Sequence, residues 1–92
     1  MAQGAVDELA ALLADRTRVL GPDHPDTLTA RHDLAWWRGE SGDVQGAVDE
    51  LAALLADCIR VLGPDQFGTL AARHALTRWR GQAGDVQGPA EA

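Results

Sequence analysis

Several residue types are scarce or missing in this 92-residue chain, and each absence removes a class of protein. A single cysteine, Cys58, cannot form an internal disulfide framework, and we expect it to be a buried, inert thiol. No apolar run approaches the roughly 20 residues that a membrane-spanning helix needs. Lysine is absent, and the net charge of -6 argues against a general nucleic-acid binder, which needs basic clusters.

What remains is an acidic chain with 46% hydrophobic residues, which is too apolar for a disordered tail. Its first residues lack the basic stretch followed by an apolar stretch that marks a secretory signal, so we expect a cytoplasmic protein. The bias toward alanine, glycine, aspartate and arginine is typical of a high-GC bacterial genome. A core of this size is marginal, so helix packing must be efficient or partners must contribute.

The chain consists of two consecutive copies of one 42-residue unit. Residues 4–45 and 46–87 are identical at 31 of 42 positions without a gap, and a short tail follows at 88–92. A fixed period between about 20 and 50 residues is typical of stacked repeats, in which each unit packs only on its neighbours. The sequence therefore predicts one helical-repeat domain over residues 1–92.

Apolar spacing and chain breakers divide each copy into two helices. The first helix shows apolar residues at steps of three and four and ends at Gly21. Pro25 opens a second helix over residues 26–39. Helices at 44–62 and 69–80 repeat the pattern, and no stretch alternates with period two. We expect an all-α fold of about four antiparallel helices.

The loop and turn residues of this unit resemble the 42-residue tetratricopeptide (TPR) repeats of the kinesin-light-chain type. The matching features are the Gly-Pro-Asp-His-Pro-Asp-Thr loop at 21–27, the Leu34-Ala35 pair, the turn glycine Gly42 and the small residue Ala47. Similar arrays occur in large regulatory proteins of high-GC bacteria. The resemblance implies a TPR-like α-solenoid that acts as a protein–protein interaction or scaffolding module, without catalytic activity or a cofactor.

Two differences between the copies concern the fourth helix. The second loop has Gln66, Phe67 and Gly68 where the first has His-Pro-Asp, so the signals that start the helix are weaker. Thr77 stands at the position of Ala35, where a small residue is preferred. We expect the fourth helix to be held less tightly than the second.

In the repeats that this unit resembles, each helical hairpin begins with the helix that lines a concave groove. In this chain the helices that match it are the second and the fourth. The resemblance therefore places the partner-binding residues on these two helices. The groove positions implied by the resemblance are Thr29, His32, Asp33, Trp36 and Glu40, with Ala71, His74, Ala75, Arg78 and Gln82 in the second copy. Four of the five pairs differ between the copies, as expected of a surface that is free to vary. We therefore expect a protein or peptide partner to bind there.

Several conspicuous side chains have more than one interpretation. We expect Trp37 and Trp79 in the core. Trp36 is either an exposed groove anchor, a residue type enriched at binding hot spots, or a packing residue against a neighbouring helix. We expect His32 and His74 to be polar groove groups and not metal ligands, because no thiol or carboxylate completes a site with metal-ligand spacing.

Basic residues are prominent on the two groove helices, whereas acids concentrate on the other helices and loops. The arginines concerned are Arg31, Arg38, Arg73, Arg78 and Arg80. This distribution favours an acidic or carboxylate-bearing peptide in the groove despite the acidic total.

The family's hairpin order leaves the first and fourth helices without an outer neighbour, and both should expose an apolar face. An alternative function is therefore a self-assembling structural unit, a homo-oligomer in which helix four of one molecule packs head to tail on helix one of another. The chain could equally be a piece of a longer array. An enzyme is not supported, because the sequence has no phosphate-binding loop, no nucleophile–base pair and no paired acids.

Overall fold

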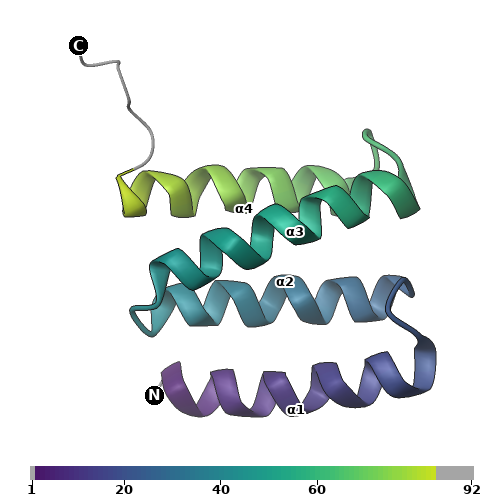
Figure 1. Ribbon diagram of the computed structural model, residues 1–92, viewed down its shortest axis with the longest axis horizontal. Helices are drawn as coiled ribbons and strands as arrows, with labels where there is room; N and C mark the ends of the chain where they lie inside the picture. The colour runs from purple at the N-terminus through teal and green to yellow at the C-terminus, as the bar shows by residue number, and fades with distance from the viewer. Residues whose placement is uncertain (1, 85–92) are drawn as a thin grey trace.

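The computed structural model describes residues 2–84, which form four α-helices (Figure 1). Their bounds are α1 (Ala2–Leu20), α2 (Pro25–Glu40), α3 (Val44–Leu62) and α4 (Phe67–Ala83). Residues 2–84 contain no strand, which confirms the all-α prediction for this part of the chain. The end of the second copy and the tail at 88–92 lie outside the described residues.

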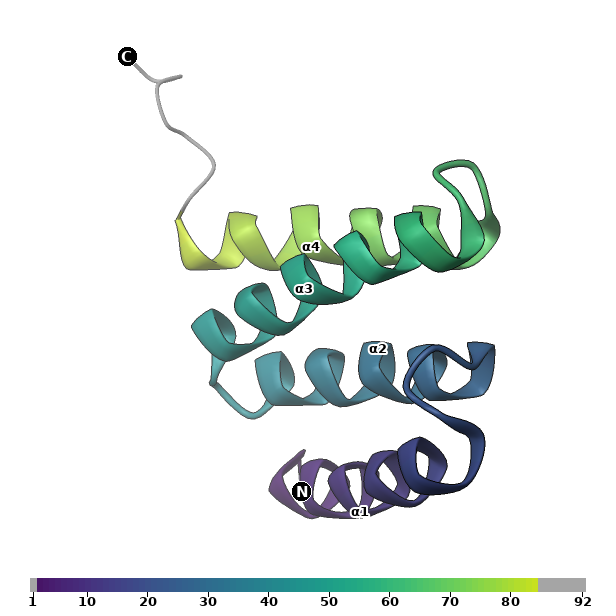
Figure 2. The same cartoon turned by 45° about the vertical axis from the view of Figure 1, so that its right-hand side comes forward.

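The helices stack in chain order, and each is antiparallel to the next (Figures 1 and 2). α3 packs between α2 and α4, which also touch each other, while α1 packs on α2. α2 and α4 consequently run in the same direction, side by side, with α3 across them. This is the open stacking of a helical repeat, with α1 at one end and α4 at the other.

The same threonine closes the loop between α1 and α2 and the loop between α3 and α4. Thr27 Oγ1 donates a hydrogen bond to the carbonyl of Gly21 at 2.8 Å, and Thr69 Oγ1 donates to the carbonyl of Gly63 at 2.7 Å. Both threonines are buried, and both glycines have φ near +97° (96° and 99°), where side chains are strained. The loop geometry is therefore set by residues that are identical in the two copies.

The prediction of a fourth helix at 69–80 was wrong at both ends, because α4 begins at Phe67 and extends to Ala83. Phe67 is the counterpart of Pro25, so α2 and α4 start at the same point of the repeat. Of these two helices, only α2 has a side-chain cap at its start, where His24 Nδ1 accepts a hydrogen bond from the amide of Asp26. α2 is one residue longer at each end than the predicted 26–39.

The core is centred on α3. Leu51 and Leu54 are its largest fully buried side chains, and Ala47 is fully buried, as expected of the small residue in this helix. Cys58 belongs to the same cluster, and burial raises the pKa of its thiol. The expectation that Cys58 is buried is confirmed, and a raised pKa disfavours the nucleophilic thiolate form.

Corresponding leucines of the two copies differ in exposure because the end helices lack an outer neighbour. Leu54 of α3 is 1% exposed, whereas its counterpart Leu12 of α1 is 39% exposed. Leu28 of α2 is 4% exposed, whereas its counterpart Leu70 of α4 is 46% exposed. The prediction that both end helices expose apolar side chains is confirmed.

Trp37 does not lie in the core, contrary to the prediction, whereas Trp79 does. Trp79 is 4% exposed and its ring lies against Gly39 of α2, so closely that a Cβ on Gly39 would be 2.7 Å from the ring. Trp37 is 40% exposed. The difference follows from the position of each residue in the array. Trp79 of α4 packs on α2, the equivalent helix of the preceding copy. Trp37 lies on α2 itself and has no such helix to pack on in this structure.

Candidate partner-binding groove

A groove runs between α2 and α4, and two open pockets of about 480 and 400 Å³ lie along it. Both pockets are lined by His32, Phe67 and Ala71, so they lie next to each other. We call this surface the α2–α4 groove; its side chains are Thr29, His32 and Trp36 on α2 and Phe67, Leu70, Ala71, His74 and Ala75 on α4.

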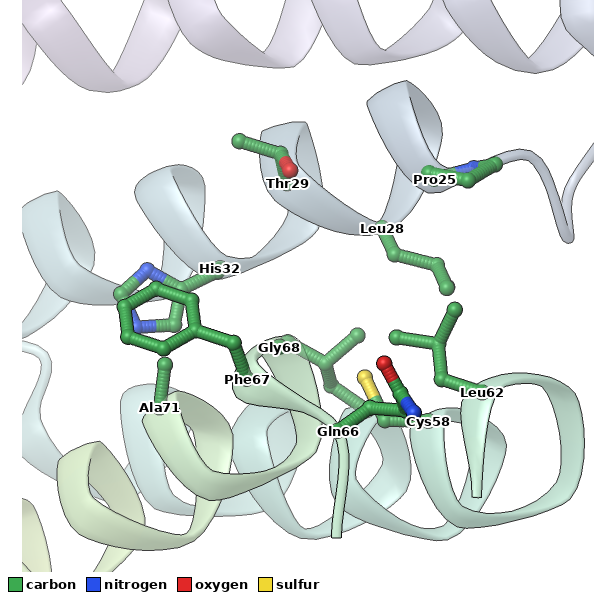
Figure 3. A pocket seen from close by; sticks show the side chains of 11 residues that line it. Pro25, Leu28, Thr29, His32, Cys58, Leu62, Gln66, Phe67, Gly68 and Ala71 are labelled. Atoms are coloured by element: carbon green, nitrogen blue, oxygen red, sulfur yellow. The ribbon is translucent and has the colours of Figure 1, made fainter. Parts of the chain in front are cut away.

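The larger pocket extends from the groove toward α3. Figure 3 shows His32 and Phe67 on one side of it and Leu28 and Leu62 on the other. Cys58 also lines this pocket. The lining is therefore mainly apolar, with Thr29, His32 and Gln66 as polar side chains, as in many sites that bind an apolar side chain.

Phe67 is the most exposed large apolar side chain among the described residues, at 84%. It stands at the first position of α4 and lines both pockets. The sequence pattern indicates only that Phe67 replaces the proline found at position 25. The appearance of an aromatic residue at that position was the signal that could have placed Phe67 in the site.

Trp36 packs on a neighbouring helix, which is one of the two interpretations given to it, and its role as a groove anchor stays a prediction. Its ring meets that of Trp79 edge to face, with centroids 5.3 Å apart and an angle of 74° between the planes. The guanidinium carbon of Arg78 lies 4.8 Å from the centroid of the Trp36 ring, a cation–π contact. Trp36 therefore packs on α4 and at the same time forms part of the groove wall.

The other predicted groove residues fall into two groups. Thr29, His32 and His74 line the pockets, as do Ala71 and Ala75. The side chains that are exposed but lie outside both pockets are Asp33, Glu40 and Gln82. No group of three metal-ligating side chains occurs within residues 2–84.

Comparison with known families identifies the type of repeat. A family profile described as tetratricopeptide repeat matches residues 2–26 and 27–67, which together are more than half of the chain. The chain belongs to the tetratricopeptide repeat family. Searches of curated proteins and of solved structures gave no match. Tetratricopeptide repeats generally mediate protein–protein interactions, which is the coarse function of this fold.

Two arginines expected to make the groove of this tetratricopeptide array basic are engaged elsewhere. Arg31 Nη1 donates a hydrogen bond of 2.7 Å to Asp57 of α3. Arg38 Nε lies 2.8 Å from a carboxylate oxygen of Glu50, which is also on α3. Their charges are matched by acids across the α2–α3 contact. The prediction of a groove made basic by these residues was wrong, and Arg78 is the arginine that contacts a groove side chain.

The ion pairs of α3 make stability depend on pH. Hydrogen bonds from Arg31 and Arg60 lower the pKa of Asp57, and a hydrogen bond from Arg60 lowers that of Asp23. A lowered folded-state pKa stabilises the fold above the unfolded value of about 4 and loses that contribution as pH falls through the folded value. Burial acts in the opposite direction on Glu50 and raises its pKa despite the Arg38 charge.

We therefore expect Asp57→Asn to lower the free energy of unfolding at pH 7 and to approach the wild type below about pH 4. The loss should be below about 1 kcal/mol, because solvent screens this partly exposed pair. Urea denaturation at several pH values measures it. Asp15→Asn is the matched control, since Asp15 holds the same repeat position but pairs with Arg18 of its own helix. Equal losses at both positions would contradict the assignment.

Within residues 2–84, no helix is both long and apolar enough to cross a membrane.

Proposed function

We propose that this tetratricopeptide protein binds a peptide or a segment of another protein in the α2–α4 groove. The observation that carries the proposal is the exposure of Phe67, which lines both of two adjacent pockets. An exposed apolar ring gains about 25 cal/mol for each Å² that a partner covers. Aromatic side chains at the centre of a concave surface are the usual anchors of such contacts.

The shape of the groove indicates what the partner presents. The larger pocket, at about 480 Å³, accommodates an apolar side chain of the partner with room for its neighbours. His32 and His74 stand on the two walls of the groove, where their ring nitrogens can pair with polar groups of a peptide backbone. Arg78, beside Trp36, offers one positive charge to a carboxylate.

The proposal predicts that Phe67→Asp abolishes most of the binding to a peptide selected from a displayed library against the wild-type protein. Loss of an anchor of this kind should raise Kd by roughly 30-fold, equivalent to about 2 kcal/mol. Calorimetric titration measures the effect. Phe67 is suited to the test because its exposed side chain adds little to the core, whereas Trp36 also packs on Trp79.

Ile59→Asp is the matched control, because Ile59 is an exposed apolar residue of α3 outside both pockets. It should bind the selected peptide like the wild type. Equal Kd values for wild type and Phe67→Asp, or a selection that yields no binder, would count against the groove.

A further inference from the structure

We infer that two copies of this chain dock head to tail, with α4 of one molecule on α1 of the next, in the register in which α2 packs on α3 inside the chain. The inference concerns the ends of the array, and of the residues involved only Leu70 also lines the α2–α4 groove. The tail surface consists of Asp65, Leu70, Arg73, Arg80 and Gly81. The head surface consists of Glu8, Leu12, Asp15, Arg18 and Trp37. Each of these residues has a counterpart one repeat away in a contact that is already formed.

The apolar part of the contact is the leucine pair. Leu28 and Leu54 are both buried and line one pocket where α2 meets α3. Their counterparts, Leu70 on the tail and Leu12 on the head, are the same residue type and are exposed. Docking in the internal register brings Leu70 of one copy to Leu12 of the next and removes both from water.

The tryptophan and glycine positions form the second part of the contact. Inside the chain the ring of Trp79 lies against Gly39, where a side chain would not fit. One repeat away, Trp37 is exposed on the head, and no atom lies within 4 Å of a Cβ built on Gly81 of the tail. The ring of one copy and the vacant space at Gly81 of another are thus complementary in shape.

Charge complementarity identifies a second copy as the occupant. Three ion pairs join α3 to α2 and its preceding loop: Arg31–Asp57 at 2.7 Å, Arg38–Glu50 at 2.8 Å and Arg60–Asp23 at 3.0 Å. Their counterparts across the proposed contact, tail residue first and head residue second, are Arg73–Asp15, Arg80–Glu8 and Asp65–Arg18. All six residues keep their type, and they are exposed in the single chain. In a tail-to-tail contact the arginines of α4 would face one another.

Several positions depart from the internal contact, among them Arg78, which stands on the tail where Trp36 meets Trp79 edge to face inside the chain. Arg16 stands on the head where Cys58 is buried inside the chain, and Thr77 stands on the tail where Ala35 is buried. Arg16 Nη1 donates to the carbonyl of Asp26 at 3.1 Å. These polar replacements make the contact between copies weaker than the internal one, so association should depend on concentration. A head-to-tail contact then closes a ring or grows open-ended.

The test uses two charge-reversed variants of the full chain, Glu8→Arg with Asp15→Arg on the head and Arg73→Glu with Arg80→Glu on the tail. Sedimentation velocity over a wide concentration range gives the molar mass. The wild type should increase in mass with concentration. Each variant alone should associate at least about tenfold more weakly because like charges meet, and an equimolar mixture should regain association because opposite charges meet again.

Gly81→Ala tests the shape of the contact without altering charge. The added Cβ would stand where the tryptophan ring of the next copy approaches, and association should weaken about tenfold although the isolated chain folds at least as well. A wild type that stays monomeric at every concentration would overturn the inference. Variants that associate as strongly as the wild type would also overturn the inference, because they would indicate that the copies meet through other surfaces. Binding of a groove peptide should be unchanged in all of them, which separates this inference from the proposed function.

Discussion

Replacing Leu54 with alanine should lower the free energy of unfolding by about 2–4 kcal/mol, whereas Leu12→Ala should cost less than about 1 kcal/mol. The two leucines occupy the same repeat position, on α3 and α1. Leu54 is enclosed between α2 and α4, so its removal loses apolar burial and leaves a cavity. Leu12 is partly in water in the single chain, and its removal leaves no enclosed cavity.

Urea denaturation followed by circular dichroism measures both losses, at a protein concentration where the chain is monomeric. A loss of several kcal/mol is large for a domain of this size, whose total stability is expected to be about 5–15 kcal/mol. The informative quantity is the difference between the losses in the free energy of unfolding that the two variants cause. Equal losses at low concentration would contradict the open position of α1. A loss at Leu12 that grows with concentration would agree with docking between copies.

Gly39→Ala and Gly81→Ala should change stability in opposite directions, although the two glycines are equivalent in the repeat. The Cβ at Gly39 would lie 2.7 Å from ring carbons of Trp79, a buried ring that also meets Trp36 edge to face. The ring has little room to move, so we expect a loss of about 1–3 kcal/mol from overpacking. That loss exceeds the gain of helix propensity, which is up to about 1 kcal/mol.

At Gly81 the gain of helix propensity is unopposed, because a Cβ there meets nothing within 4 Å. Gly81→Ala should therefore raise the free energy of unfolding by about 0.5–1 kcal/mol. Thermal and urea denaturation of both variants give the signs directly. If Gly39→Ala also stabilised the protein, the packing of Trp79 on α2 would be contradicted.

The helices could be predicted from the sequence because two copies of one pattern support each other. The bounds of the third helix were predicted as they are observed, and α2 differs by one residue at each end. The start of α4 was missed because Phe67 and Gly68 carry no capping or proline signal. The start is set instead by the repeat itself, in which Thr69 closes the loop onto Gly63 as Thr27 does onto Gly21.

The surroundings of identical residues could not be predicted in the same way. Trp37 and Trp79 have the same place in the apolar pattern, but only a preceding helix of the same type buries such a residue, and the first copy has none in this structure. Similarly, arginines on a groove helix were assigned to the groove. The angular position of Arg31 around α2 instead directs it to Asp57 of α3.

The groove itself was predicted in part. Family resemblance located the side of α2 and α4 that carries His32, Trp36 and His74, because the spacing of groove residues follows the helical period. Phe67 was missed because it lies in a loop segment by sequence and becomes part of the groove only when α4 is extended to include it. A site that joins two helices depends on their packing, which the pattern of a single helix does not contain.

The most direct test of the groove is a two-dimensional NMR titration of the protein with a selected peptide, observing the three indole N–H signals. Trp36 lines the groove, Trp37 lies on the head surface and Trp79 is buried. Binding in the groove should shift the Trp36 signal and leave that of Trp37 unchanged. A peptide that binds while shifting Trp37 and leaving Trp36 unchanged would contradict the account.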